Sequence, residues 1–122
     1  MKKKYDLEER LIVFALAMMK LSESLPNSSI GLNLSNQIHR SGTSPALNYG
    51  EAQAAESRKD FIHKFRLILK ELRETKICLE LIKRYPLVVN PESIENEIIE
   101  CGALIGIFTK SIQTAKSKMT SK

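Results

Sequence analysis

The chain has 122 residues and a mass of 13.8 kDa, which is the size of a single domain. Hydrophobic residues make up 43% of it and charged residues 27%, which excludes disordered and collagen-like chains. The net charge of +5 permits contact with nucleic acid but does not establish it. The longest apolar run, Leu11 to Met19, is too short for the roughly 20 residues of a membrane helix, so we expect no membrane span.

Two further features predict a cytoplasmic protein. The lysines at positions 2–4 are followed by Asp6 and Glu8 before any apolar stretch, which is the wrong order for a secretory signal. Cys78 and Cys101 are too few for a disulfide scaffold and lack the Cys-x-x-Cys spacing of zinc sites. We therefore expect two reduced, buried thiols.

Helix-start and helix-stop residues divide the chain into four segments. Ser57 is a good N-cap, and Asn90 followed by Pro91 is a strong start because proline at the first helical position loses no hydrogen bond. Pro26 and Pro86 follow the first and third segments. The predicted helices span residues 6–25, 29–56, 58–85 and 91–118.

Three segments repeat apolar residues at alternating steps of three and four, which places them on one helix face. In the first, these are Leu7, Leu11, Phe14, Met18, Leu21 and Leu25. In the third, they are Phe61, Phe65, Ile68, Leu72, Thr75, Leu79 and Ile82. In the fourth, they are Ile94, Ile98, Cys101, Ile105, Phe108, Ile112 and Ala115. We predict an all-α protein, an up-down antiparallel four-helix bundle formed by a single domain over residues 1–122.

The second segment differs because the same steps give a small and partly polar face. Pro45 cannot donate a hydrogen bond to the carbonyl of Ser41, which predicts a kinked or a broken helix. A line of polar residues also follows this segment: Gln37, Arg40, Ser41, Ser44, Asn48 and Glu51. Such groups must be hydrogen-bonded or solvated. The line is either a network that fixes helix or subunit register, which we favour, or the lining of a pore or pocket.

The sequence holds more apolar residues than the core of one bundle needs. Residues 11–19 are apolar almost all round the helix. The third and fourth segments add apolar residues outside their repeats: Ile62, Leu67, Leu69, Leu81, Ile99, Leu104 and Ile107. Either the helices have wide core faces, or a second subunit covers the surplus. We favour the second interpretation and expect a homo-oligomer.

Catalytic signals are weak. A carboxylate-bridged di-metal bundle needs two Glu-x-x-His motifs, whereas only Asp60-x-x-His63 comes near one, so we expect no metal and no cofactor. Arg58-x4-His63 resembles the Arg-x4-6-His motif of HEPN ribonucleases, helical bundles that cleave RNA across a dimer interface. Lys59 replaces the polar uncharged or acidic residue usual there, and His63 falls on the outer face. We expect no enzyme, and ribonuclease action remains the weaker alternative.

A basic row on the third segment is the stronger functional signal. Its members recur at steps of four and three on the face opposite the apolar repeat: Lys59, His63, Arg66, Lys70 and Arg73. Cations stacked along a helix can follow a phosphate backbone. No aromatic residue interleaves them, so this binding would depend on charge or shape rather than sequence. The alternative is an ordinary solvated face.

The second and third segments also resemble a known family. Residues 34–52 read Leu-Ser-x-Gln-Ile-x-Arg-Ser-x-Thr-Ser-Pro-Ala-x-Asn-x-x-Glu-Ala, and Ser57, Asp60-Phe61, Lys64 and Lys70-Glu71-x-x-Glu74-Thr75 follow. This pattern is similar to that of the bacterial four-helix-bundle proteins encoded by intervening sequences within 23S ribosomal RNA genes. One departure is Cys78, where relatives commonly carry Trp.

The resemblance implies a homopentameric barrel of up-down bundles, with the polar line at a subunit boundary or central channel. It leaves function poorly defined. A subgroup serves as accessory proteins of diversity-generating retroelements and contacts nucleic acid and a reverse transcriptase. We therefore expect a non-enzymatic homo-oligomer that binds RNA or DNA through the basic row. A protein scaffold that touches no nucleic acid is the alternative.

Overall fold

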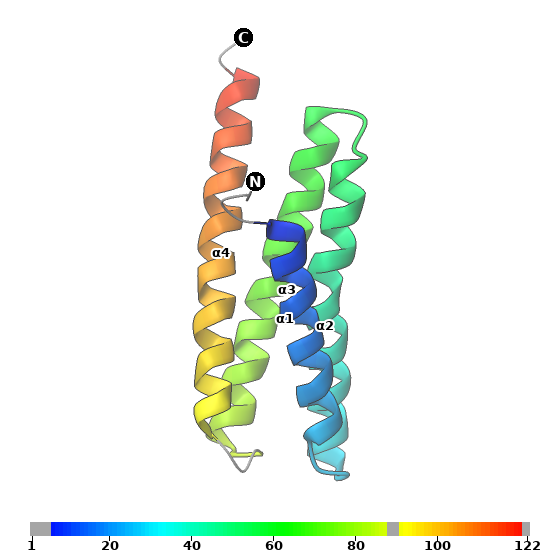
Figure 1. Ribbon diagram of the computed structural model, residues 1–122, viewed down its shortest axis with the longest axis vertical. Coiled ribbons are helices and arrows are strands. Elements are labelled where there is room, and N and C mark those ends of the chain that lie inside the picture. The colour runs from blue at the N-terminus through cyan, green and yellow to red at the C-terminus, as the bar shows by residue number, and fades with distance from the viewer. Residues whose placement is uncertain (1–5, 88–90, 121–122) are drawn as a thin grey trace.

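The computed structural model describes residues 6–87 and 91–120, which form four helices (Figure 1). The helices are α1 (Leu7–Ser24), α2 (Ser29–Gln53), α3 (Arg58–Arg84) and α4 (Pro91–Thr120). Successive helices run in opposite directions (Figure 1), and the described residues contain no strand. The predicted all-α, up-down architecture is therefore confirmed within one chain.

The helix starts follow from capping side chains. The side chain of Asp6 accepts a hydrogen bond from the backbone N–H of Glu9, and Ser57 accepts one from Asp60. The predicted cap Asn90 lies outside the described residues. The second helix ends at Gln53, before the predicted residue 56, because the N–H of Ala54 bonds back to the Glu51 carbonyl in a tighter turn.

Helix α2 runs through Pro45 without interruption. Of the two outcomes that this proline predicts, a broken helix is not found. The proline is buried in the bundle, so packing on both sides of α2 holds the helix together despite the lost hydrogen bond.

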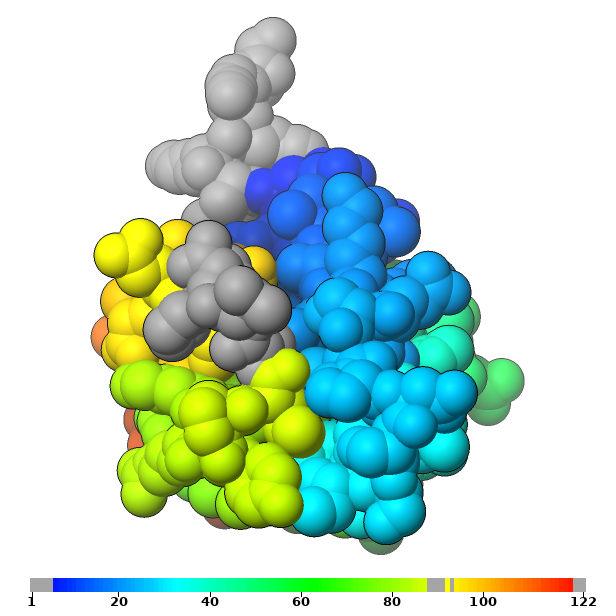
Figure 2. All heavy atoms as spheres, turned by 90° about the horizontal axis from the view of Figure 1, so that it is seen from below, coloured from blue at the N-terminus to red at the C-terminus, as the bar shows by residue number. Residues whose placement is uncertain are grey.

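The core is formed by the predicted apolar faces. Phe14, Ile68 and Phe108 are almost fully buried, and Phe65 packs edge-on against Phe108 with ring centroids 5.0 Å apart. Figure 2, which looks along the helices from below, shows the order α1, α2, α3, α4 around the bundle. Each helix packs closely on the next one in the chain, whereas α1 and α4 contact one another far less. The bundle is thus tight along three borders and loose along the fourth.

The surplus apolar residues have two different fates. Ile62 and Leu104 are buried, so wide core faces account for them. Leu81 and Ile99 are exposed, as are four residues of α1: Ile12, Val13, Leu16 and Met19. Leu16 is 50% exposed and Val13 is 55% exposed, although both side chains are apolar. A single chain therefore leaves an apolar face on α1 uncovered.

Cys78 and Cys101 are free and buried, as predicted. Burial raises the pKa of the Cys78 thiol to about 11, with a smaller contribution from Glu74, and burial raises the pKa of Cys101 to about 12. Both sulfurs donate to backbone carbonyls, Cys101 to that of Leu72 at 3.2 Å. None of the described helices combines the length and the apolar character that crossing a bilayer requires.

Candidate nucleic-acid interface

The basic row lies on the outer face of α3. All five members, Lys59, His63, Arg66, Lys70 and Arg73, are exposed. They face away from the side of α3 that packs on α2 and α4, because the buried residues Phe65, Ile68 and Leu72 occupy the opposite face. With a rise of about 1.5 Å per residue, the row extends for roughly 21 Å along the helix.

Several cations outside the row are paired with carboxylates. Arg10, Lys64 and Lys83 each bond to a carboxylate on another helix, at 2.7, 2.6 and 2.6 Å. Within residues 6–87 and 91–120, by contrast, no acidic side chain lies at ion-pair distance from any member of the row. The row is therefore a set of exposed positive charges that the described part of the chain does not neutralise.

The upper half of the row borders a groove between α3 and α4, which we call the outer groove. It has a volume of about 870 Å³ and is lined by Lys59, His63 and Arg66 on one side and by Lys116 of α4 on the other. Ile62 and Met119 add apolar surface, and Asp60 is its acidic member. Cations therefore stand on both walls of the groove.

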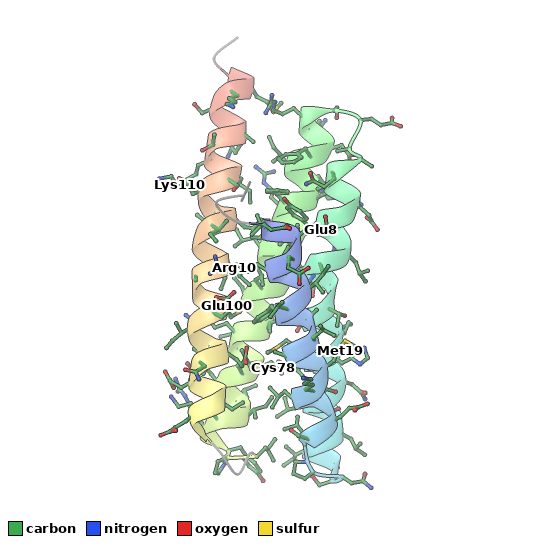
Figure 3. All side chains as sticks on the ribbon, viewed as in Figure 1. Glu8, Arg10, Met19, Cys78, Glu100 and Lys110 are labelled. Atoms are coloured by element: carbon green, nitrogen blue, oxygen red, sulfur yellow. The ribbon has the colours of Figure 1, made fainter. Side chains whose placement is uncertain are left out.

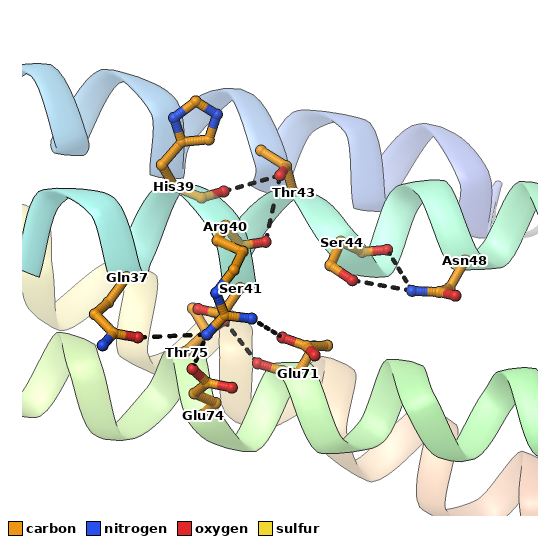
Figure 4. Close-up of polar contacts among 10 residues, drawn as sticks. All are labelled: Gln37, His39, Arg40, Ser41, Thr43, Ser44, Asn48, Glu71, Glu74 and Thr75. Carbon is orange, nitrogen blue, oxygen red and sulfur yellow. Dashed lines mark hydrogen bonds and ion pairs between the residues drawn. The ribbon is translucent and has the colours of Figure 1, made fainter.

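The polar line of α2 faces α3 within the same chain (Figure 4). Arg40 donates to Glu71 at 3.2 Å, to Gln37 at 3.3 Å and also to Glu74. Ser41 is fully buried, and its hydroxyl lies 2.8 Å from that of Thr75. This network ties the middle of α2 to the middle of α3.

The upper end of the line combines hydrogen bonds within α2 with an ion pair to α3. The amide of Asn48 donates to the carbonyl and the hydroxyl of Ser44, and Glu51 accepts a 2.6 Å bond from Lys64 of α3. That bond is the main reason why the pKa of Lys64 is raised. Sequence reasoning missed the acidic partners of Arg40, Glu71 and Glu74, because pairing across helices depends on how the helices are rotated.

Arg58 and His63 do not converge in one chain. Arg58 lines a hollow beside Phe61 at the end of the bundle, whereas His63 lines the outer groove. An Arg–His pair of the HEPN type would therefore need one side chain from each of two subunits. In the part of the chain that the structure describes, no group of three or more His, Cys, Asp and Glu side chains is placed to hold a metal ion.

A comparison with family models matches residues 3–106 to the 23S rRNA-intervening sequence protein family. The chain belongs to this family. The match includes all of α1, α2 and α3 and half of α4, so the family assignment and the bundle rest on the same residues.

A solved structure similar to this chain has the same fold. It is a protein of unknown function from the S23 ribosomal protein family of Bacteroides thetaiotaomicron VPI-5482, with a crystal structure at 1.70 Å resolution. It is 33% identical to this chain, with a TM-score of 0.80 over 88% of this chain and 98% of that one. A comparison with curated proteins gives no match.

Proposed function

We propose that this family member binds the phosphate backbone of RNA or DNA through the basic row. The observation that carries the proposal is the row itself: four exposed Lys and Arg side chains stand in line with His63, and none of the five has an acidic partner within the described chain. Regularly spaced cations neutralise phosphates and release counterions, which is the main source of non-specific affinity for nucleic acid.

The proposed binding reads charge and shape rather than sequence. The row contains no Phe, Tyr or Trp ring on which a base could stack, and four of its five members are Lys or Arg. We expect similar affinities for RNA and DNA strands of unrelated sequence. Binding should weaken steeply as salt concentration rises.

We also propose that the protein works as a homo-oligomer, with the five copies that the family resemblance implies. The exposed apolar residues of α1 support this proposal, because Val13, Leu16 and Ile12 form a surface that a second copy would remove from water. Several rows on one assembly would bind a long nucleic acid with far greater avidity than one row alone.

Fluorescence anisotropy with short labelled RNA and DNA tests the binding proposal. Arg66→Glu combined with Arg73→Glu should abolish binding at low salt. Lys20→Glu with Arg84→Glu makes the same change in net charge outside the row and should bind like the wild type. Equal loss in both variants would mean that only net charge matters, and unchanged binding by the row variant would refute the proposal.

Light scattering tests the assembly. The wild type should be several times heavier than 13.8 kDa at micromolar concentration, whereas Leu16→Glu should lower the mass because it places a charge in the apolar face. Lys20→Arg is a suitable control on the same helix, since it changes an exposed residue and keeps its charge. A wild-type monomer would contradict the oligomer.

Protein scaffolding without nucleic acid is the second candidate. The observation that favours it is a group of three exposed apolar residues near the C-terminal end of α3: Ile77, Leu81 and Tyr85. If this function is correct, neither RNA nor DNA binds at low salt, and Leu81→Glu abolishes co-purification with a host protein. Ribonuclease action through Arg58 and His63 is the weakest candidate, and RNA cleavage that survives His63→Ala would eliminate it.

A further inference from the structure

The first helix is too short to cover one end of the bundle. Helix α1 has 18 residues, whereas α2, α3 and α4 have 25, 27 and 30. Figure 1 shows that α1 begins well below the upper ends of the other three helices. The missing turns leave a hollow of about 670 Å³ above the start of α1, which we call the end pocket. This volume lies within the ~300–1,000 Å³ range of small-molecule sites.

Aromatic rings form part of the lining of the end pocket. Tyr49 of α2 and Phe61 and Phe65 of α3 all line it. Phe61 and Phe65 lie with ring centroids 4.2 Å apart and planes inclined by 31°, and Tyr49 lies 6.0 Å from Phe65 at 34°. Phe65 is buried, whereas Tyr49 and Phe61 are only half-buried. Tyr49 and Phe61 thus keep part of their surface in the pocket, where a flat ring can pack against them.

Polar side chains of α3 and α4 also line the end pocket. Arg58 comes from the first turn of α3, and Lys110 and Lys118 come from α4. Ser111 and Thr114 of α4 add two hydroxyl groups. Lys110 lies higher on α4 than Glu100 (Figure 3), beyond the level at which Arg10 of α1 pairs with that carboxylate.

The charge of the end pocket is mainly positive. Among the lining residues that the structure describes, the acidic one is Asp6, whose carboxylate already accepts the N–H of Glu9 as a helix cap. Three cations therefore face one carboxylate. A ligand for this pocket should be anionic at one end and flat and aromatic at the other.

We propose that the end pocket binds a nucleotide, with its base on Phe61 and Tyr49 and its phosphate at Arg58, Lys110 and Lys118. Arginine and lysine are the usual phosphate ligands in proteins, and aromatic faces accept any base. A fatty acid or an inorganic anion would use only one half of this lining. The nucleotide is either free or the terminal residue of a strand. The proposal does not depend on the basic row, because no residue of the row lines the end pocket.

Titration of the full-length protein with fluorescent ADP, and competition by smaller compounds, test the proposal. ADP should bind, whereas adenosine and ribose 5-phosphate should each compete at least about tenfold more weakly, because each lacks one half of the recognised chemistry. If ribose 5-phosphate competes as well as ADP, the aromatic platform has no role and the proposal is wrong.

Variants locate the site. Lys110→Glu with Lys118→Glu changes two exposed residues and should weaken ADP binding at least about tenfold, as expected for the loss of charge-assisted bonds. The row variant Arg66→Glu with Arg73→Glu is the control and should bind ADP like the wild type. Phe61→Leu tests the platform, with its folding checked by circular dichroism. Absence of ADP binding, or binding that survives reversal of both lysines, would overturn the proposal.

A last comparison separates the two sources of the nucleotide. In the background of the row variant, a 5′-phosphorylated oligonucleotide should displace ADP if the pocket takes a strand end, and its 5′-hydroxyl counterpart should not. If only free nucleotides displace ADP, the pocket serves a small molecule. Because this comparison removes the row, its failure leaves the proposed backbone binding untouched.

Discussion

Gly42 of α2 lies directly against Met18 of α1. A β-carbon placed on Gly42 would stand 2.5 Å from Cγ and 2.6 Å from Cβ of Met18, which is closer than such atoms ever approach. Met18 is fully buried, so it has little room to move away. The absence of a side chain at position 42 therefore sets the distance between the two helices at mid-length.

Gly42→Ala should destabilise the protein by about 1–3 kcal/mol, because the added methyl group forces α1 and α2 apart. Gly50 of the same helix has open space around the site of a β-carbon. Gly50→Ala should therefore raise the free energy of unfolding by about 0.5–1 kcal/mol through helix propensity alone. Urea unfolding measures both values, and an unchanged stability of Gly42→Ala would contradict the close approach.

The buried hydroxyl pair of Ser41 and Thr75 allows a double-mutant cycle. Thr75 Oγ1 lies 2.7 Å from the carbonyl of Glu71 and 2.8 Å from Ser41 Oγ, in a place without water access. Thr75→Val should cost about 1–3 kcal/mol because it leaves the Ser41 hydroxyl without its partner. Adding Ser41→Ala should restore part of this loss. Strictly additive effects in the unfolding free energies would show that the two hydroxyls are not coupled.

Glu97 should make the protein less stable at neutral pH than at acidic pH. It lines the loose border between α1 and α4 beside Val13 and Leu16, and burial raises the pKa of its carboxyl, with a smaller contribution from Glu100. Because the pKa is higher in the folded than in the unfolded chain, this carboxyl favours folding at low pH. The favourable contribution is lost as the pH rises through the raised pKa.

Glu97→Gln should accordingly raise the melting temperature at pH 7, since it removes a charge that is partly desolvated. The difference from the wild type should shrink as the pH falls below the ordinary glutamate pKa of 4.5. Glu56→Gln, in the exposed turn between α2 and α3, serves as a control and should have little effect at either pH. A lower melting temperature of Glu97→Gln at pH 7 would refute this explanation.

The two thiols should react slowly in the folded protein. Both are buried and their pKa values are raised to about 11 and about 12, so few thiolates exist at pH 8. A disulfide reagent should modify Cys78 and Cys101 at the rate of unfolding, and at once in urea. Rapid modification of either thiol without denaturant would show that its site is open.

The same raised pKa values predict a loss of stability in alkali. The unfolded thiols ionise near their ordinary pKa of 9.0, whereas the folded thiols remain neutral until about pH 11 or 12. Their contribution to stability is therefore complete below pH 9 and declines above it. Cys78→Ala with Cys101→Ala should flatten the decline of the unfolding free energy between pH 9 and 10.5.

Local chemistry determined the helices of this protein. The apolar repeats predict which faces are buried, and Leu11, Leu72 and Phe108 are indeed almost inaccessible. Capping residues such as Ser57 predict where helices begin, because a cap acts within one turn of its own position. The exposed row on α3 also follows from sequence, since the face opposite a buried repeat must point outward.

Relations between helices were decided only by the tertiary structure. The pairing of Arg40 with Glu71 and Glu74 depends on the rotation of α2 against α3, and no periodicity specifies that rotation. The end pocket brings Tyr49, Phe61 and Lys118 together from three helices, because the short α1 begins below the ends of its neighbours. The spacing of residues along the chain indicates which face of a helix each residue occupies. The stagger of the helices and the contacts between them are set only when their buried surfaces pack.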